Sequence, residues 1–281
     1  MTGRAKQRRA ALALGVPWDE DCHLLMEDIP LPVPTHFEGN IQPDLAHDLF
    51  QLAGTLRRDG NKHLKSIESD PLFNLTKGIL EVLLSYVLSG CDQVINDAVA
   101  GNSSRRQLRI DCGKGCSACC HINVEVSIPE AILVAMDVGQ AEDPRRATIK
   151  ETVDAVAGLS DMARSRTGLP CPFLTQDGAC SVYQRRPIAC RTYLSPDRER
   201  CHRALKNAIA GTGDDTAASH GFPQLIGSAH RAAMAGICKD HGLQHDYVDL
   251  ANAVASIIQG PQLIERWASG EHVFVSRSNK E

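Results

Sequence analysis

Hydrophobic positions recur with helical spacing along most of the chain. Between residues 44 and 58 four leucines fall on one face of a helix: Leu45, Leu49, Leu52 and Leu56. Asp70 and Pro71 have the residue types of an N-cap and a first helical position. They predict a long apolar helix that begins there and runs to about Ala100.

The pattern beyond residue 126 predicts further helices. Ser127 and Glu130 have the spacing of a capping box, so a short helix is expected to about Val138. Asp143 and Pro144 predict a helix to about Ser165. Residues 196–269 are expected to be helical, with breaks at Gly211–Asp215, Gly242 and Gly260-Pro261.

Two polar, cysteine-dense segments interrupt this helical pattern, at residues 101–126 and 171–201. Within the second, Asp177-Gly178 is typical of a hairpin turn. No alternation of strands and helices is present. The predicted fold class is therefore mainly α: a helical domain whose two cysteine-rich irregular insertions, one with a short β-hairpin, form a metal-binding knot.

The predicted organisation has three parts. Residues 1–40 contain alternating prolines and are expected to form an extended arm. Residues 41–269 are expected to form a single helical domain with the metal-binding region at 105–203. Residues 270–281 are expected to form a loose tail.

Net charge and composition argue against some classes of function. The 281 residues carry a net charge of −4, which gives no general basic surface for nucleic acid. The apolar segment from Leu72 to Val99 contains four charged residues, so it predicts a buried helix rather than a membrane span. Because the basic N-terminus lacks a long apolar run, a cytoplasmic location is expected. The partner is expected to be a protein or small molecule of unspecified kind.

The 11 cysteines carry the candidate chemistry, since many thiols in a reducing compartment indicate metal or redox chemistry. Eight of them lie within 90 residues: Cys112, Cys116, Cys119, Cys120, Cys171, Cys180, Cys190 and, as the weakest candidate, Cys201. Short spacings let thiolates converge on one metal, and Gly113 and Gly115 relax the backbone between them. Buried free cysteines explain one or two such residues, not eight. Eight cysteines are enough for two metal sites of four thiolates each, or for one metal cluster with some thiols that are not ligands.

Cys119 and Cys120 are adjacent, and neighbouring side chains usually diverge. We therefore expect them to serve two sites, or one to ligate while the other packs or reacts. His121 and His202 are further candidates for ligation, although each is more often an ordinary polar residue.

Cations near the cysteines favour a [4Fe–4S] cluster over zinc, although both accept four thiolates. They are Arg105, Arg106, Arg109, Lys114, Arg185, Arg186 and Arg191. Guanidinium groups offset the negative charge of a thiolate-ligated cluster and donate to its sulfur. Arg186 and Arg191 are the candidates for contact with the cofactor.

Several of these elements, in order, resemble the YkgJ-type cysteine-cluster family, also called the zinc- or iron-chelating domain family. They are Cys112/Cys116/Cys119/Cys120, Cys171-Pro-Phe-Leu174, Cys180-Ser-Val-Tyr183 and Arg186-Pro-Ile-Ala-Cys190-Arg191. The resemblance covers about 80 residues and implies iron–sulfur or zinc binding. The family includes a flagellin lysine N-methylase linked to an iron–sulfur cluster, so a similar activity is one alternative. A zinc-binding structural or metal-handling protein is another.

Other chemistry is less well supported, and whether the chain is an enzyme stays open. Cys112, Cys116 and Cys119 have the spacing of radical S-adenosylmethionine enzymes, but position 118 is Ala where an aromatic is usual, and no barrel pattern is present. A stripe of His230, Met234 and Cys238, which His241 and His245 extend, predicts a core helix face with solvated histidines more readily than a soft-metal site.

Overall fold

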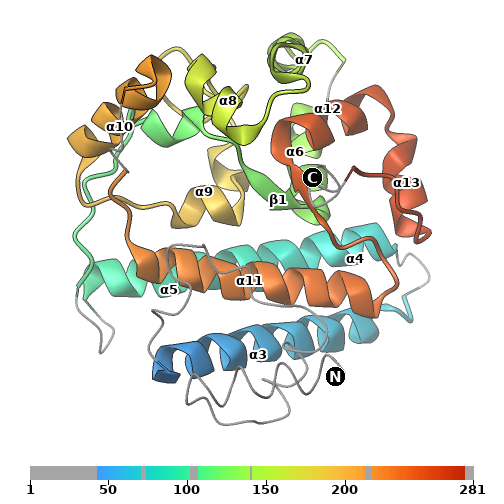
Figure 1. Ribbon diagram of the computed structural model, residues 1–281. Coiled ribbons are helices and arrows are strands. Elements are labelled where there is room, and N and C mark those ends of the chain that lie inside the picture. Colours follow the sequence, from blue (N-terminus) through green and yellow to red (C-terminus); the bar gives the residue numbers. More distant parts are fainter. Residues whose placement is uncertain (1–42, 71–73, 102–106, 140, 213–216, 276–281) are drawn as a thin grey trace, which may run out of the picture. The chain divides into compact units, whose positions relative to one another are not determined.

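The computed structural model describes residues 43–70, 74–101, 107–139, 141–212 and 217–275 (Figure 1). The predicted arm lies outside these residues, as does the tail after residue 275. Helices dominate the described chain, together with a two-stranded sheet, which confirms the mainly α class. The chain divides into two compact units, one of residues 1–96 and 221–245 and one of residues 97–220 and 246–281.

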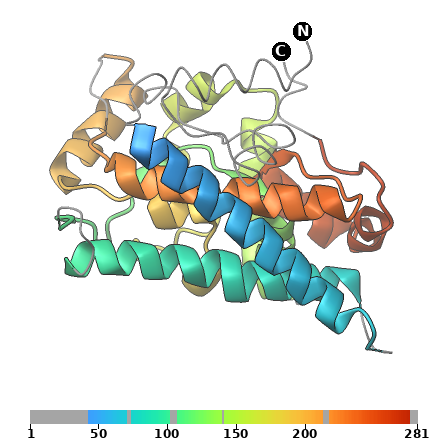
Figure 2. The ribbon, with the colours of Figure 1, turned by 90° about the horizontal axis from the view of Figure 1, so that it is seen from below.

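The first unit is built from long helices. They are α3 (Pro43–Ile67), α4 (Leu75–Val82), the π-helical η2 (Leu83–Leu88), the first part of α5 (Ser89–Ala100) and α11 (Gly221–Asp240). Helix α11 packs against α3 and η2 (Figure 2). The hydrophobic core of this first unit consists of leucine, isoleucine and valine side chains such as Leu49, Val82 and Ile237. Met234 and Cys238 are also buried in α11, as expected for a core face. His230 is buried with them, so the expectation of a solvated histidine is wrong at this position; its Nδ1 contacts Ile226 O at 2.8 Å.

The helix predicted from Asp70 begins instead at Leu75, so the predicted cap is wrong. Asn74 caps it, because its side-chain oxygen accepts a hydrogen bond from Lys77 N at 3.1 Å. The helix then continues through η2 and α5 to Ala100. By length and composition alone this stretch is long and apolar enough to cross a membrane, but half of its most apolar window is buried, and a core helix meets the same test.

A partly buried ion pair joins α3 to the end of α11. Arg57 is 5% exposed, and its Nε donates to Asp240 Oδ2 at 2.7 Å while Nη2 binds the other carboxylate oxygen. Asn61 Nδ2 also donates to Asp240 Oδ2, at 2.6 Å. The guanidinium crosses directly over Gly236, where a Cβ would lie 2.7 Å from Arg57 Cδ. The absence of a side chain at Gly236 therefore gives Arg57 its path to Asp240.

Replacing Asp240 with alanine is expected to lower the free energy of unfolding by about 2–3 kcal/mol, because it takes the carboxylate away from a buried guanidinium. Urea denaturation followed by circular dichroism measures this change. The matched control is Asp154→Ala, which removes one partner of the exposed Lys150–Asp154 pair and should leave stability almost unchanged. Equal effects of the two variants would contradict the prediction.

The second unit combines short helices with a small sheet. Its elements are η3 (Ala118–His121), β1 (Glu125–Ser127), α6 (Ile128–Val138), α7 (Arg145–Val156), α8 (Asp161–Thr167), η4 (Tyr183–Arg185), α9 (Ile188–Thr192), α10 (Arg198–Ala210), β2 (Tyr247–Asp249), α12 (Leu250–Gln259) and α13 (Gln262–Ala268). Strands β1 and β2 pair antiparallel, with Val126 opposite Val248, and α12 packs on α6 and α7. Three-residue strands are too short to show alternation, so the sequence did not predict them.

In this unit the predicted boundaries are correct for one helix and wrong for another. The capping box of Ser127 and Glu130 is present at the start of α6, and that helix ends at Val138 as predicted. The single helix predicted from Asp143 to Ser165 is in fact two helices. Helix α7 ends at Val156, and α8 begins after a new N-cap, Ser160, whose hydroxyl accepts from Ala163 N.

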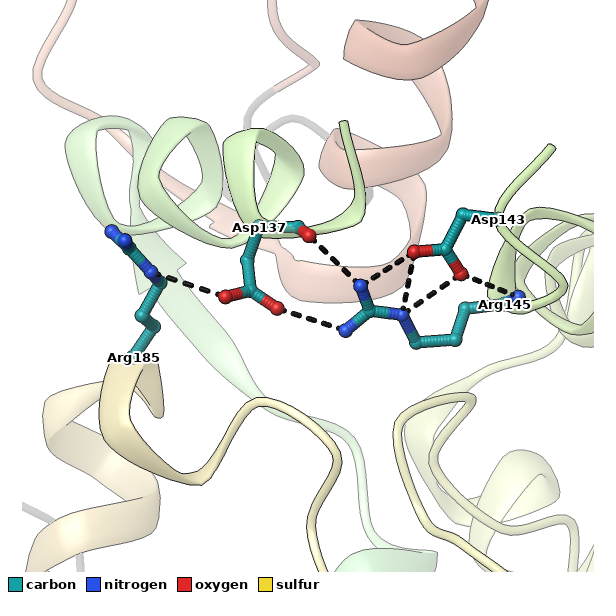
Figure 3. Close-up of polar contacts among 4 residues, drawn as sticks. All are labelled: Asp137, Asp143, Arg145 and Arg185. Carbon is teal, nitrogen blue, oxygen red and sulfur yellow. Dashed lines mark hydrogen bonds and ion pairs between the residues drawn. The ribbon is translucent and has the colours of Figure 1, made fainter. Parts of the chain in front are cut away.

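Charged side chains fasten the ends of α6 and α7 to η4 (Figure 3). Arg145 donates to both Asp143, at the start of α7, and Asp137, at the end of α6. Asp137 also accepts from Arg185 Nε of η4 at 3.1 Å. The hydrogen bond from Arg145 holds the pKa of Asp143 below its usual range. This network positions the turn that follows Cys180.

Candidate metal centre

The first cysteine segment is fixed to the chain around Ser195. Asp111 N donates to Ser195 O at 2.9 Å, and Arg198 N donates to Asp111 Oδ2 at 3.0 Å. These bonds place Cys112 beside residues that lie more than 80 positions later. Asp111 and Cys112 of the first segment therefore lie beside Ser195 of the second segment.

Ser195 contacts two candidate sulfurs at once. Its backbone N–H donates to Cys112 Sγ at 3.1 Å, and its hydroxyl oxygen accepts from the Cys201 thiol at 3.2 Å. Ser195 is only 1% exposed, so neither contact competes freely with water. Cys201, the weakest candidate by sequence, thus shares a residue with Cys112. Sequence reasoning did not identify Ser195, because a lone serine outside a motif carries no signal.

The second segment meets the first at two points. Cys171 N donates to Cys120 O at 2.6 Å. The turn predicted at Asp177-Gly178 forms, with Gly178 at a positive φ of 77°, but a single bridge between Leu174 and Cys180 takes the place of a longer hairpin ladder. A Cβ on Gly178 would lie 3.2 Å from Gly115 Cα, so the two loops touch through glycines.

A buried carboxylate fixes the helix that carries Cys190. Glu130 is 2% exposed, and its Oε1 accepts from Ile188 N, the first residue of α9, at 2.7 Å. Its Oε2 accepts from the backbone and hydroxyl of Ser127. Glu130 therefore links the capping box of α6 to α9. The sequence indicated the capping box but gave no sign of the bond to Ile188.

The candidate thiols are partly buried and favour the protonated form. Burial raises the pKa of Cys112, Cys116, Cys180 and Cys190, and raises that of Cys171 to about 11. A hydrogen bond with Cys120 raises the pKa of Cys119. A cation would offset the cost of burying thiolates, and sulfur ligands suit zinc and iron. The donor set thus fits the implied metals.

The two predicted arginines have different surroundings. Arg186 lies over the Tyr183 ring at 4.2 Å, and its Nε is buried with no hydrogen-bond partner among the described residues. Burial raises the pKa of Cys180 and Cys190, and the nearby Arg186 charge opposes this rise. Arg191 instead donates to Arg186 O and Gln184 O, each at 2.7 Å. It holds the backbone of the turn that carries Arg186.

The sulfurs share one unit but do not form a closed coordination shell. Within the described ranges, no three His, Cys, Asp or Glu side chains lie close enough together to hold a metal ion as they stand. His121 Nδ1 contacts Ser117 O within its own turn, and His202 is half-buried on α10. Metal binding at these cysteines therefore requires side chains to move toward a common centre.

Comparison with known proteins places the cysteine region in a family. Residues 111–207 match the family model CxxCxxCC, whose description is "Putative zinc- or iron-chelating domain". No curated protein and no solved structure matches the chain. The matched range contains all eight candidate cysteines, Ser195 and Arg186. The match of residues 111–207 to this zinc- or iron-chelating domain model confirms the resemblance to the cysteine-cluster family that the motifs indicate.

Proposed function

We propose that this protein holds a [4Fe–4S] cluster through its clustered cysteines and uses it in a redox or group-transfer role. The ligands are drawn from Cys112, Cys116, Cys119, Cys120, Cys171, Cys180, Cys190 and Cys201. When bound, such a cluster transfers single electrons. The lysine N-methylase alternative rests on the family resemblance alone.

The observation that carries this proposal is the buried Nε–H of Arg186, which has no hydrogen-bond partner among the described residues. The Arg186 charge also acts on the Cys119, Cys180 and Cys190 thiols, because it opposes the rise of their pKa values. A buried donor without an acceptor is costly, and cluster sulfur would accept its hydrogen bond. The Ser195 N–H already donates to Cys112 Sγ. Donors and positive charge around sulfur are the features that set cluster potentials.

Anaerobic purification followed by iron, zinc and sulfide analysis tests the choice of metal. We expect a brown protein with iron and sulfide in equal amounts and broad absorption near about 400 nm. A colourless protein that carries zinc would overturn the iron–sulfur proposal and support the alternative, a zinc-binding structural or metal-handling protein.

A variant pair sharpens this test. Removal of a positive charge near a cluster makes its reduction less favourable, so Arg186→Gln should lower the reduction potential measured by redox titration. The matched control is Arg185→Gln, because Arg185 pairs with Asp137 and is 40% exposed at its side chain. An equal shift in both variants would mean that Arg186 has no particular role at the cluster.

A further inference from the structure

Cys112 and Cys201 both contact Ser195, but through different groups of the serine. We infer that Cys112 ligates the metal, whereas Cys201 is a positioning residue that holds Ser195 in place and does not ligate. This inference rests on the proposed metal binding and applies to zinc and to [4Fe–4S] alike, since both take cysteine thiolates. It leaves the seven other candidate cysteines as possible ligands.

The Ser195 hydroxyl has no hydrogen available for Cys201. Its Oγ donates to Asp197 O at 3.0 Å and accepts from Asp197 N at 3.1 Å. A hydroxyl carries one hydrogen and two lone pairs. The contact of Ser195 Oγ with Cys201 Sγ, at 3.2 Å, therefore joins the second lone pair of the oxygen to the S–H group of the cysteine. To donate to a Cys201 thiolate instead, the hydroxyl would have to give up Asp197 O.

The second polar neighbour of Cys201 Sγ is also an acceptor. The sulfur contacts Ala218 O at 3.7 Å, and a carbonyl oxygen cannot donate. Among the described residues, no N–H group donates to this sulfur. Cys201 is 6% exposed, so water does not supply the missing donors. Because a buried anion without donors is costly, these surroundings favour a thiol rather than the thiolate that a metal requires.

Cys112 has the opposite surroundings. Its Sγ accepts from the Ser195 backbone N–H at 3.1 Å, whereas its contact with Ser195 O is longer, at 3.7 Å. An N–H group that donates to sulfur stabilises a thiolate and tunes the metal that it binds. The Ser195 backbone is fixed as well, because its carbonyl accepts from Asp111 N at 2.9 Å. Cys201 thus fixes the serine side chain, and the serine presents its N–H to Cys112.

The test measures metal per chain, and metal affinity by competition with a chelator, in full-length protein purified anaerobically. Cys201→Ser should match wild type in both, because its hydroxyl can donate to Ser195 Oγ as the thiol does. Cys201→Ala neither donates nor ligates, so it should hold the same amount of metal with about 10-fold lower affinity. Cys112→Ser should lose most of its metal. The matched control is Cys238→Ser, at a buried thiol of α11, which should match wild type.

A second variant tests whether Cys201 acts through the serine. Ser195→Ala removes the Oγ and should lower the metal affinity as much as Cys201→Ala does. The Ser195→Ala/Cys201→Ala double variant should bind no more weakly than either single variant, because both changes remove the same hydrogen bond. A general loss of packing would instead add the two effects, and Cys201→Ser would not restore the affinity.

The outcomes separate this inference from the proposed function. Loss of metal from a folded Cys201→Ser or Cys201→Ala protein would show that Cys201 ligates, and full metal in Cys112→Ser would show that Cys112 does not. Either result overturns the inference and leaves metal binding intact. A wild-type protein without metal would overturn the proposed function itself. If neither Cys201 variant folds, Ser195→Ala decides, since an unchanged affinity would show that the serine side chain has no role.

Discussion

Removal of the metal is expected to unfold the two cysteine-bearing stretches, residues 111–124 and 171–192, while α3 and α11 keep their structure. These stretches hold only short helical turns, η3, η4 and α9, and one isolated bridge. Their few fully buried apolar side chains include Phe173 and Ile188. Metal sites of this kind contribute on the order of 10 kcal/mol to the free energy of folding. Once the metal is removed, so small a hydrophobic core cannot supply that much stability.

Hydrogen exchange before and after chelation measures this effect. Backbone amides of α9 should lose protection by more than about 100-fold, whereas those of α11 should change little. The Cys116→Ser/Cys190→Ser double variant is the control, since a protein without metal should not respond to the chelator. Full protection of α9 in the metal-free wild type would show that the fold of this region does not depend on metal.

Replacing Glu130 with alanine is expected to lower the free energy of unfolding by about 3–5 kcal/mol. The change removes a buried carboxylate that accepts from Ile188 N and from the backbone and hydroxyl of Ser127. Those donors would stay buried without their acceptor. Since Ile188 begins the helix that carries Cys190, metal retained by the folded variant should also fall.

Urea denaturation and metal analysis of Glu130→Ala measure both effects. Glu130→Gln is expected to be intermediate, because its amide oxygen replaces one acceptor while its NH₂ group faces a donor. The matched control is Glu142→Ala, at an exposed position, which should change stability by less than about 0.5 kcal/mol. A Glu130→Ala protein as stable as this control would show that the three hydrogen bonds contribute little.

Local patterns in the sequence predicted the local features of the fold and failed where contacts are distant. The Ser127–Glu130 capping box and the turn at Asp177-Gly178 are encoded within a few residues, and both form. The bonds from Ile188 to Glu130 and from Ser195 to Cys112 span 58 and 83 positions. The spacing of hydrophobic and polar residues along the sequence does not indicate contacts between residues so far apart in the chain. The division into an arm, one domain at 41–269 and a tail stays a prediction.

The site itself was predictable in its residue types but not in its grouping. Cysteine spacing identified the two segments, and the family model covers both. Spacing could not show that Cys201 joins Cys112, because the link passes through Ser195. It also could not distinguish Arg186, whose buried Nε lacks a partner among the described residues, from Arg191, which donates to backbone carbonyls.

The bond between Cys112 and Ser195 has a consequence for the order of events during protein synthesis. The two residues are 83 positions apart, and a ribosome adds about 5–20 residues per second. The first thiols therefore leave the ribosome about 4–17 s before the serine that gathers them. Throughout that interval they are exposed to oxidants and to competing metals. Correct loading thus depends on delivery of the metal after both segments have emerged.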